Sequence, residues 1–120
     1  LIDQTEAFTM QIESTKYKRC DLIKLQGRLD SASAPKLAEV IDSITDEGRY
    51  KIVLDMEELT FISSAGLRVL INAQKTCKRY NRGEVVFTNV PANIMSALDL
   101  AGFTVLFKIF EDTVTAVGNF

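Results

Sequence analysis

The chain has 120 residues, with 14 lysines and arginines against 16 aspartates and glutamates, and 47% of its residues are hydrophobic. It contains no histidine, the commonest general base and a common zinc ligand, so histidine-dependent catalysis and ordinary zinc sites are excluded. The net charge of −2 offers no overall attraction to nucleic acid or to an anionic membrane.

Length and composition indicate one domain over residues 1–120, with a core over about 8–117. No apolar stretch approaches the length of a membrane span, and the first residues, which include Asp3 and Glu6, lack the basic start of a signal peptide. We therefore expect a cytoplasmic protein. Cys20 and Cys77 have neither metal-ligand nor redox spacing, and we expect no metal and no cofactor.

Two strands are predicted first. Apolar Phe8, Met10 and Ile12 alternate with polar residues over 8–14, which predicts an edge strand with one face in solvent. After a turn at 17–19, a second strand is predicted over 20–26 and closed by Gly27. The short connection favours an antiparallel hairpin.

Small residues over 31–35 then open a helix, in which Pro35 suits the first turn. Apolar residues recur at helical spacing from Leu37 to Ile44, and Gly48 is expected to end this helix. The apolar run 51–55 predicts a strand covered on both faces, as in a parallel sheet.

Helices and strands alternate in the rest of the chain. A helix is predicted over 64–80, a strand over 84–88, a helix from Pro91 to Gly102 with Ile94, Leu98 and Ala101 facing inward, a strand over 105–110 and a short helix over 111–117. The predicted fold is α/β: a mixed, mostly parallel β-sheet with an initial antiparallel hairpin and about four helices.

In an open α/β sheet, ligands and partners meet the carboxyl ends of the parallel strands, where residues 27–31 and 59–67 are expected to converge. Ser63 and Ser64 stand at the start of a predicted helix, whose unpaired N–H groups stabilise an anion. A phosphate on Ser64 would bring a charge of about −1.5 to −2 there. Serine is also a favoured N-cap, and both roles can hold if Ser63 caps the helix while Ser64 is exposed.

Residues 55–70, DMEELTFISSAGLRVL, resemble the signature of the STAS family, the sulphate transporter and anti-sigma factor antagonist domains. The turn GRLD at 27–30 and the ending around Gly102 are similar as well, so the resemblance covers nearly the whole chain. It implies the STAS fold. The chain's size resembles that of the free-standing bacterial anti-sigma factor antagonists.

The resemblance implies a binding protein rather than an enzyme. The unphosphorylated form would bind an anti-sigma factor that is also a serine kinase, phosphorylation would release it, and a serine phosphatase would reset the switch that regulates sigma-factor-dependent transcription. By position in the motif the acceptor is Ser64. Several antagonists carry aspartate immediately before the acceptor, whereas this chain has a second serine there, so Ser63 is a secondary candidate. The implied partner surface comprises Asp30, Ser31, Ser33, Thr60, Ser63, Ala65, Gly66, Leu67 and Arg68.

Two alternatives remain open. The chain could be a STAS subunit of a stress-signalling or lipid-transport assembly that is not phosphorylated at Ser64. Nucleotide sensing is the other, and the absence of a glycine-rich phosphate loop weighs against it.

Basic residues from Arg68 to Arg82 lie along one face of the predicted helix and are expected either to face solvent or to dock an acidic partner; direct nucleic-acid binding is not expected.

Asp55 ends a strand as the acceptor of a response-regulator receiver does, and Lys108 could imitate the receiver's lysine. The acidic pair that holds Mg²⁺ is missing, so Asp55 is expected to be a turn or loop-anchoring residue.

Overall fold

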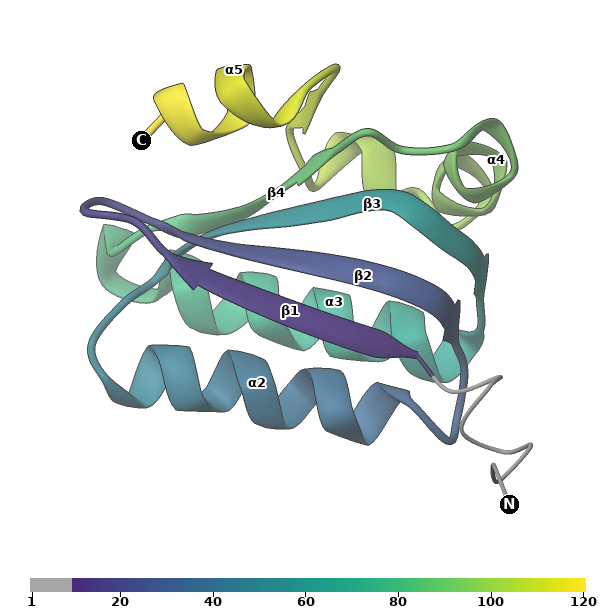
Figure 1. Ribbon diagram of the computed structural model, residues 1–120, viewed down its shortest axis with the longest axis horizontal. Coiled ribbons are helices and arrows are strands. Elements are labelled where there is room, and N and C mark those ends of the chain that lie inside the picture. The colour runs from purple at the N-terminus through teal and green to yellow at the C-terminus, as the bar shows by residue number, and fades with distance from the viewer. Residues whose placement is uncertain (1–9) are drawn as a thin grey trace.

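A five-stranded mixed β-sheet lies at the centre of the computed structural model, which describes residues 10–120 (Figure 1). The strands lie in the order β1-β2-β3-β4-β5, with β1 antiparallel to β2 and the other neighbours parallel. The bounds are β1 Gln11–Lys16, β2 Asp21–Leu29, β3 Lys51–Ile62, β4 Glu84–Thr88 and β5 Ile109–Phe110. The predicted fold class is therefore confirmed.

Within residues 10–120, four α-helices pack around the sheet: α2 Ala34–Asp46, α3 Ser64–Lys78, α4 Ala92–Leu100 and α5 Thr113–Gly118. Figure 1 shows α2 and α3 side by side against one face, while α5 lies across the sheet from them. The main core fills the space between the sheet and the first of these faces, with Leu37 of α2 and Leu70 of α3 fully buried. A smaller cluster packs Val53 and Val86 against Ala116 of α5.

The first hairpin forms as predicted, with a shift in its bounds. Strand β1 is an edge strand, and the N–H of Tyr17 donates to the carbonyl of Cys20 at 2.8 Å to close the turn. Phe8, part of the predicted strand, lies outside the described residues. The prediction that Gly27 ends β2 is wrong, because the strand continues to Leu29. Gly27 has φ +107° beside a shift in the β2–β3 register, so it bends the strand at a bulge.

Strand β3 is much longer than the predicted 51–55. Its first half pairs with β2 and β4 and is buried, whereas beyond Asp55 it pairs with β2 alone. In this second half, polar Glu57, Glu58 and Thr60 are exposed. The second half therefore lacks the continuous apolar run that predicts a buried strand. Residues 59–62, expected to lie beyond this strand, therefore belong to β3, and Ser63 alone separates β3 from α3.

Helix boundaries follow the predicted signals closely. Gly48 follows α2 with φ +80°, and Pro91 precedes α4, in which Ile94 and Leu98 are buried as expected. Ala101 is exposed, so its predicted inward position is wrong. The predicted helix 64–80 ends as α3 at Lys78 and continues as a 3₁₀ turn, Arg79–Asn81.

The predicted strand 105–110 is also wrong in extent, because β5 covers only Ile109–Phe110, after a 3₁₀ turn at Phe103–Val105. The reason is the buried side chain of Gln74. Its amide oxygen accepts from the N–H of Val85 at 2.6 Å, and its amide nitrogen donates to the carbonyls of Val85 (3.2 Å) and Leu106 (2.9 Å). Gln74 thus satisfies the edge of β4 at a place where a longer β5 would have paired.

Candidate functional site

The carboxyl ends of β2 and β3 meet at the start of α3. Leu29 and Ile62, the last residues of the two strands, are register partners, and the N–H of Ser63 donates to the carbonyl of Leu29 at 2.8 Å. Gly66, in the first turn of α3, packs directly on Leu29. The two segments predicted to converge are therefore joined by backbone hydrogen bonding, and this junction forms the candidate site.

The two serines of the junction have different environments. Ser63 is extended (φ −100°, ψ 173°), and its Oγ accepts from the N–H of Gly66 at 3.3 Å, so it is the N-cap of α3. Ser64 is the first helical residue, and it is exposed. A capping serine and an adjacent exposed serine therefore both exist here: Ser63 is half-buried, and Ser64 is exposed.

A hydrogen-bonded turn after β2 forms the second wall of the site. The Asp30 carboxylate accepts from the N–H groups of Ala32 (3.0 Å) and Ser33 (3.1 Å). The Ser33 N–H bond is the main reason that the pKa of the Asp30 carboxyl is lowered from its ordinary value. The turn therefore presents a fixed carboxylate, with exposed Ser31 beside it.

Two of the nine predicted partner-surface residues lie in the interior. Ser33 is 4% exposed and donates its hydroxyl to the carbonyl of Arg28 at 2.6 Å, and Gly66 is buried against Leu29. Their assignment to a contact surface is corrected, since both hold the site together from within. The other predicted residues reach the surface wholly or in part: Asp30, Ser31, Thr60, Ser63, Ala65, Leu67 and Arg68.

An exposed pair of side chains at this surface was not predicted from the sequence. Arg28 and Phe61 are register partners on β2 and β3, and the Arg28 guanidinium stacks 4.1 Å from the centre of the Phe61 ring. Phe61 is 37% exposed. Simple alternation along β3 does not predict this position, because Thr60 and Phe61 are both exposed where the β2–β3 register shifts between Gly27 and Arg28.

The exposed face of α3 extends away from the serines. Arg68, Asn72 and Lys75 are exposed, while Leu70, Gln74 and Cys77 are buried, so the predicted exposed basic face is confirmed as far as Lys75. Its extension to Arg82 is wrong, because α3 ends at Lys78 and the backbone of Tyr80 is not helical. Arg68 lies one turn after Ser64 and on the same face. Docking of an acidic partner along this face remains a prediction.

Asp55 has a structural environment. It is 6% exposed within β3, and its carboxylate accepts from the N–H of Glu57 at 3.0 Å and from the side-chain amide of Asn89 at 3.2 Å. The loop-anchoring role is confirmed, although the residue stands in a strand rather than in a turn. Lys108 pairs with Glu84 at 3.2 Å, not with Asp55.

Both thiols are buried. Burial raises the pKa of Cys77 to about 12, and burial, followed by the neighbouring Asp21, raises the pKa of Cys20. Within residues 10–120, no three carboxylate or thiol side chains are placed to hold a metal ion, and no helix has the length and apolar character needed to cross a membrane.

The chain is similar to known proteins over most of its length. The family model of the STAS domain matches residues 11–116. The chain is 31% identical over 96 residues to BtrV of Bordetella bronchiseptica, named as an anti-sigma factor antagonist, covering 80% of this chain and 82% of that protein. It is 25% identical over 104 residues to the anti-sigma-B factor antagonist of Staphylococcus aureus, covering 87% and 95%.

Solved structures share the fold. The anti-sigma factor antagonist SpoIIAA in its unphosphorylated form matches with a TM-score of 0.77 at 14% identity, over 91% of this chain and 95% of that one. SpoIIAA of Bacillus in its phosphorylated form matches with a TM-score of 0.70 at 16% identity, over 92% and 98%.

Proposed function

Because the chain belongs to the STAS domain family, we propose that it is an anti-sigma factor antagonist whose binding is switched by phosphorylation of Ser64. In this proposal the unphosphorylated protein binds an anti-sigma factor with serine kinase activity and so regulates sigma-factor-dependent transcription. Phosphorylation releases the partner, and a serine phosphatase resets the switch. The names of the two relatives support the antagonist role.

The observation that carries the choice of serine is the contrast between Ser63 and Ser64. The Ser63 hydroxyl caps α3, whereas Ser64 is exposed at the first helical position. A kinase must reach its acceptor oxygen, and modification of Ser63 would also compete with the cap. We therefore assign the acceptor to Ser64, and the phosphorylated form of the structural neighbour SpoIIAA is consistent with a switch of this kind.

The electrostatics favour release rather than unfolding. A phosphate on Ser64 carries a charge of about −1.5 to −2 and would lie at the positive end of α3. It would also lie on the same face of the helix as Arg68, one turn away. It is therefore stabilised in the free protein. In a complex the phosphate must lose its hydration water against the partner. If the partner presents acidic groups here, the phosphate and the carboxylate of Asp30 both repel them.

The partner surface in this proposal is built from the Asp30–Ser31 turn, the Arg28–Phe61 pair and the first turn of α3. Arginine and aromatic side chains are enriched at the energetically important centres of protein interfaces. Phe61 is exposed and Arg28 covers its ring, so this pair offers an apolar contact beside the switch serine.

The decisive experiment is mass mapping of the protein purified from its native host, before and after phosphatase treatment. A phosphate on Ser64 supports the proposal, and a phosphate on Ser63 would correct the residue. No phosphate under growing or stressed conditions would contradict the switch and favour an unmodified STAS subunit in a larger assembly.

Binding measurements with the copurifying anti-sigma factor complete the test. Ser64→Ala is expected to bind as the unmodified protein does, even with ATP and active kinase present, whereas Ser64→Glu is expected to bind at least about tenfold more weakly. Ser64→Gln, of the same size as glutamate but uncharged, is the matched control. Equal affinity of the Glu and Gln variants would contradict an electrostatic switch.

A further inference from the structure

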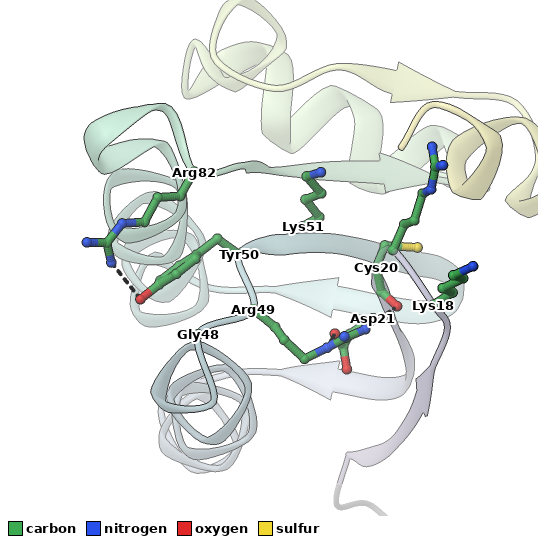
Figure 2. Close-up of a pocket in the computed structure, with 9 residues that line it drawn as sticks. Lys18, Cys20, Asp21, Gly48, Arg49, Tyr50, Lys51 and Arg82 are labelled. Atoms are coloured by element: carbon green, nitrogen blue, oxygen red, sulfur yellow. Dashed lines mark hydrogen bonds and ion pairs between the residues drawn. The ribbon is translucent and has the colours of Figure 1, made fainter.

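A basic pocket lies at the end of the sheet opposite to the serines. It has a volume of about 410 Å³, and five cationic side chains line it: Lys18, Arg19, Arg49, Lys51 and Arg82. They come from the β1–β2 turn, from the segment before β3 and its first residue, and from the segment that follows α3 (Figure 2). The chain as a whole carries a net charge of −2, so this concentration of positive charge is a local property.

One of the five cations is neutralised and fixed. The Arg49 guanidinium pairs with Asp21 at 2.5 Å and donates to the carbonyls of Tyr17 (2.6 Å) and Cys20 (3.0 Å), and Figure 2 shows Arg49 and Asp21 directed at each other. Asp21 is 2% exposed and is the only carboxylate among the lining residues. This ion pair lines the pocket, and the hydrogen bonds of Arg49 tie the β1–β2 turn to the segment before β3.

A second cation is held over aromatic rings. Arg82 donates to the Tyr50 hydroxyl at 2.7 Å, and its guanidinium carbon lies 4.9 Å from the Tyr50 ring centre and 5.2 Å from that of Tyr80. Gly83 makes this approach possible, because a Cβ there would collide with the Tyr50 carbonyl. These contacts restrict the conformational freedom of the Arg82 side chain without pairing its charge with a carboxylate. The guanidinium is therefore preorganised for binding an anion.

Three cations remain available. Lys18, Arg19 and Lys51 are exposed, and none makes a side-chain hydrogen bond or ion pair with another residue of the described part of the chain, 10–120. Like charges held around one concavity repel each other in the absence of a counter-charge. An anion with several charges would relieve that repulsion.

From this arrangement we infer that the pocket binds a small polyanion that carries at least two phosphate groups. The pocket volume falls within the range of small-molecule sites. Arg82 can make paired hydrogen bonds to phosphate oxygens, and the lysines act as point charges. A concave site at one end of a net acidic chain fits a compact ligand better than a nucleic acid, which needs an extended basic surface.

This site is independent of the proposed partner surface. Strand β3 carries Lys51 at one end and Ile62 at the other, and α3 runs from Ser64 to the turn that leads to Arg82. The pocket therefore stays open when the serine end is occupied, and either inference can fail without the other.

The test is isothermal titration calorimetry of the full chain with tripolyphosphate at low and at physiological salt. Binding is expected, with about tenfold weaker affinity for each cation removed in Arg19→Ala and Lys51→Ala. The matched control is a Lys36→Ala, Lys75→Ala double variant, which removes two exposed charges outside the pocket and should bind as the wild type does. Thermal unfolding of each variant checks that it folds, as expected for exposed positions.

Parallel titrations with ATP, poly-glutamate and duplex DNA identify the class of ligand. Equal affinity for ATP and tripolyphosphate supports recognition of phosphates alone, and tighter binding of ATP supports a nucleotide as their source. The inference is overturned if tripolyphosphate does not bind at millimolar concentration, or if the control double variant loses as much affinity as the pocket variants. Tighter, pocket-dependent binding of poly-glutamate or DNA would overturn it in favour of a macromolecular partner.

Discussion

Gly66 lies so close to Leu29 that a Cβ at residue 66 would stand 2.6 Å from the leucine Cγ and 3.0 Å from its carbonyl oxygen. The same carbonyl accepts the N–H of Ser63 at 2.8 Å. The first turn of α3 is therefore fixed on the last residue of β2 by one contact and one hydrogen bond. This junction determines where Ser64, between the two contacts, meets solvent.

Replacement of Gly66 by alanine is expected to reduce stability by about 1–3 kcal/mol, because the added methyl group overpacks a site that includes backbone atoms. Urea unfolding measures the change. Gly118→Ala is the matched control, since a Cβ there meets nothing within 4 Å, and its effect should stay within about 0.5 kcal/mol. Equal effects of the two substitutions would contradict the close contact.

The two serines should separate in stability measurements. Ser63→Ala removes the hydroxyl that accepts from the N–H of Gly66, and the loss expected for an N-cap is about 0.5–2 kcal/mol. Ser64→Ala, at an exposed first helical position, should change the free energy of unfolding by less than about 0.5 kcal/mol. If Ser64→Ala proved the more destabilising, the capping assignment would be reversed.

Gln74→Leu should destabilise the protein although leucine is similar in size and apolar. The substitution leaves the N–H of Val85 and the carbonyls of Val85 and Leu106 without their side-chain partner, at a cost of about 1–3 kcal/mol. Gln26→Leu, at an exposed position of β2, is the control and should be nearly neutral. Hydrogen exchange at the Val85 amide should accelerate in the Gln74 variant alone.

Alkylation of the thiols should be slow until the protein unfolds. Cys20 and Cys77 are buried with raised pKa values, so at pH 8 both remain protonated and unreactive toward iodoacetamide in the native state, and both react in urea. The raised pKa of Cys77 stabilises the fold below the ordinary thiol pKa of 9.0, and this contribution declines as the pH rises toward about 12. Mass spectrometry after timed alkylation measures the reactivity, and rapid labelling of Cys77 in native conditions would contradict its burial.

The sequence by itself determined the elements whose signals are local. Helix α2, with its Pro35 start and Gly48 stop, and strand β4 were predictable because periodicity and capping depend on neighbouring residues in the chain. The same holds for the basic face of α3 and for the approach of the two loops at the carboxyl ends of the strands. The motif around Ser63 and Ser64 also identified the family from sequence alone.

Tertiary structure decided whatever depends on which segments become neighbours. Strand β3 continues past Asp55 because β2 still pairs with it there, and β5 is short because Gln74 has already bonded the edge of β4. Ser33 and Gly66 were predicted as surface residues but are buried, Ser33 in the turn between β2 and α2 and Gly66 against Leu29 of β2. The basic pocket is the clearest case, because residues 18, 51 and 82 are distant in the chain. They meet because the parallel strands β2, β3 and β4 bring their amino-terminal ends together at one end of the sheet.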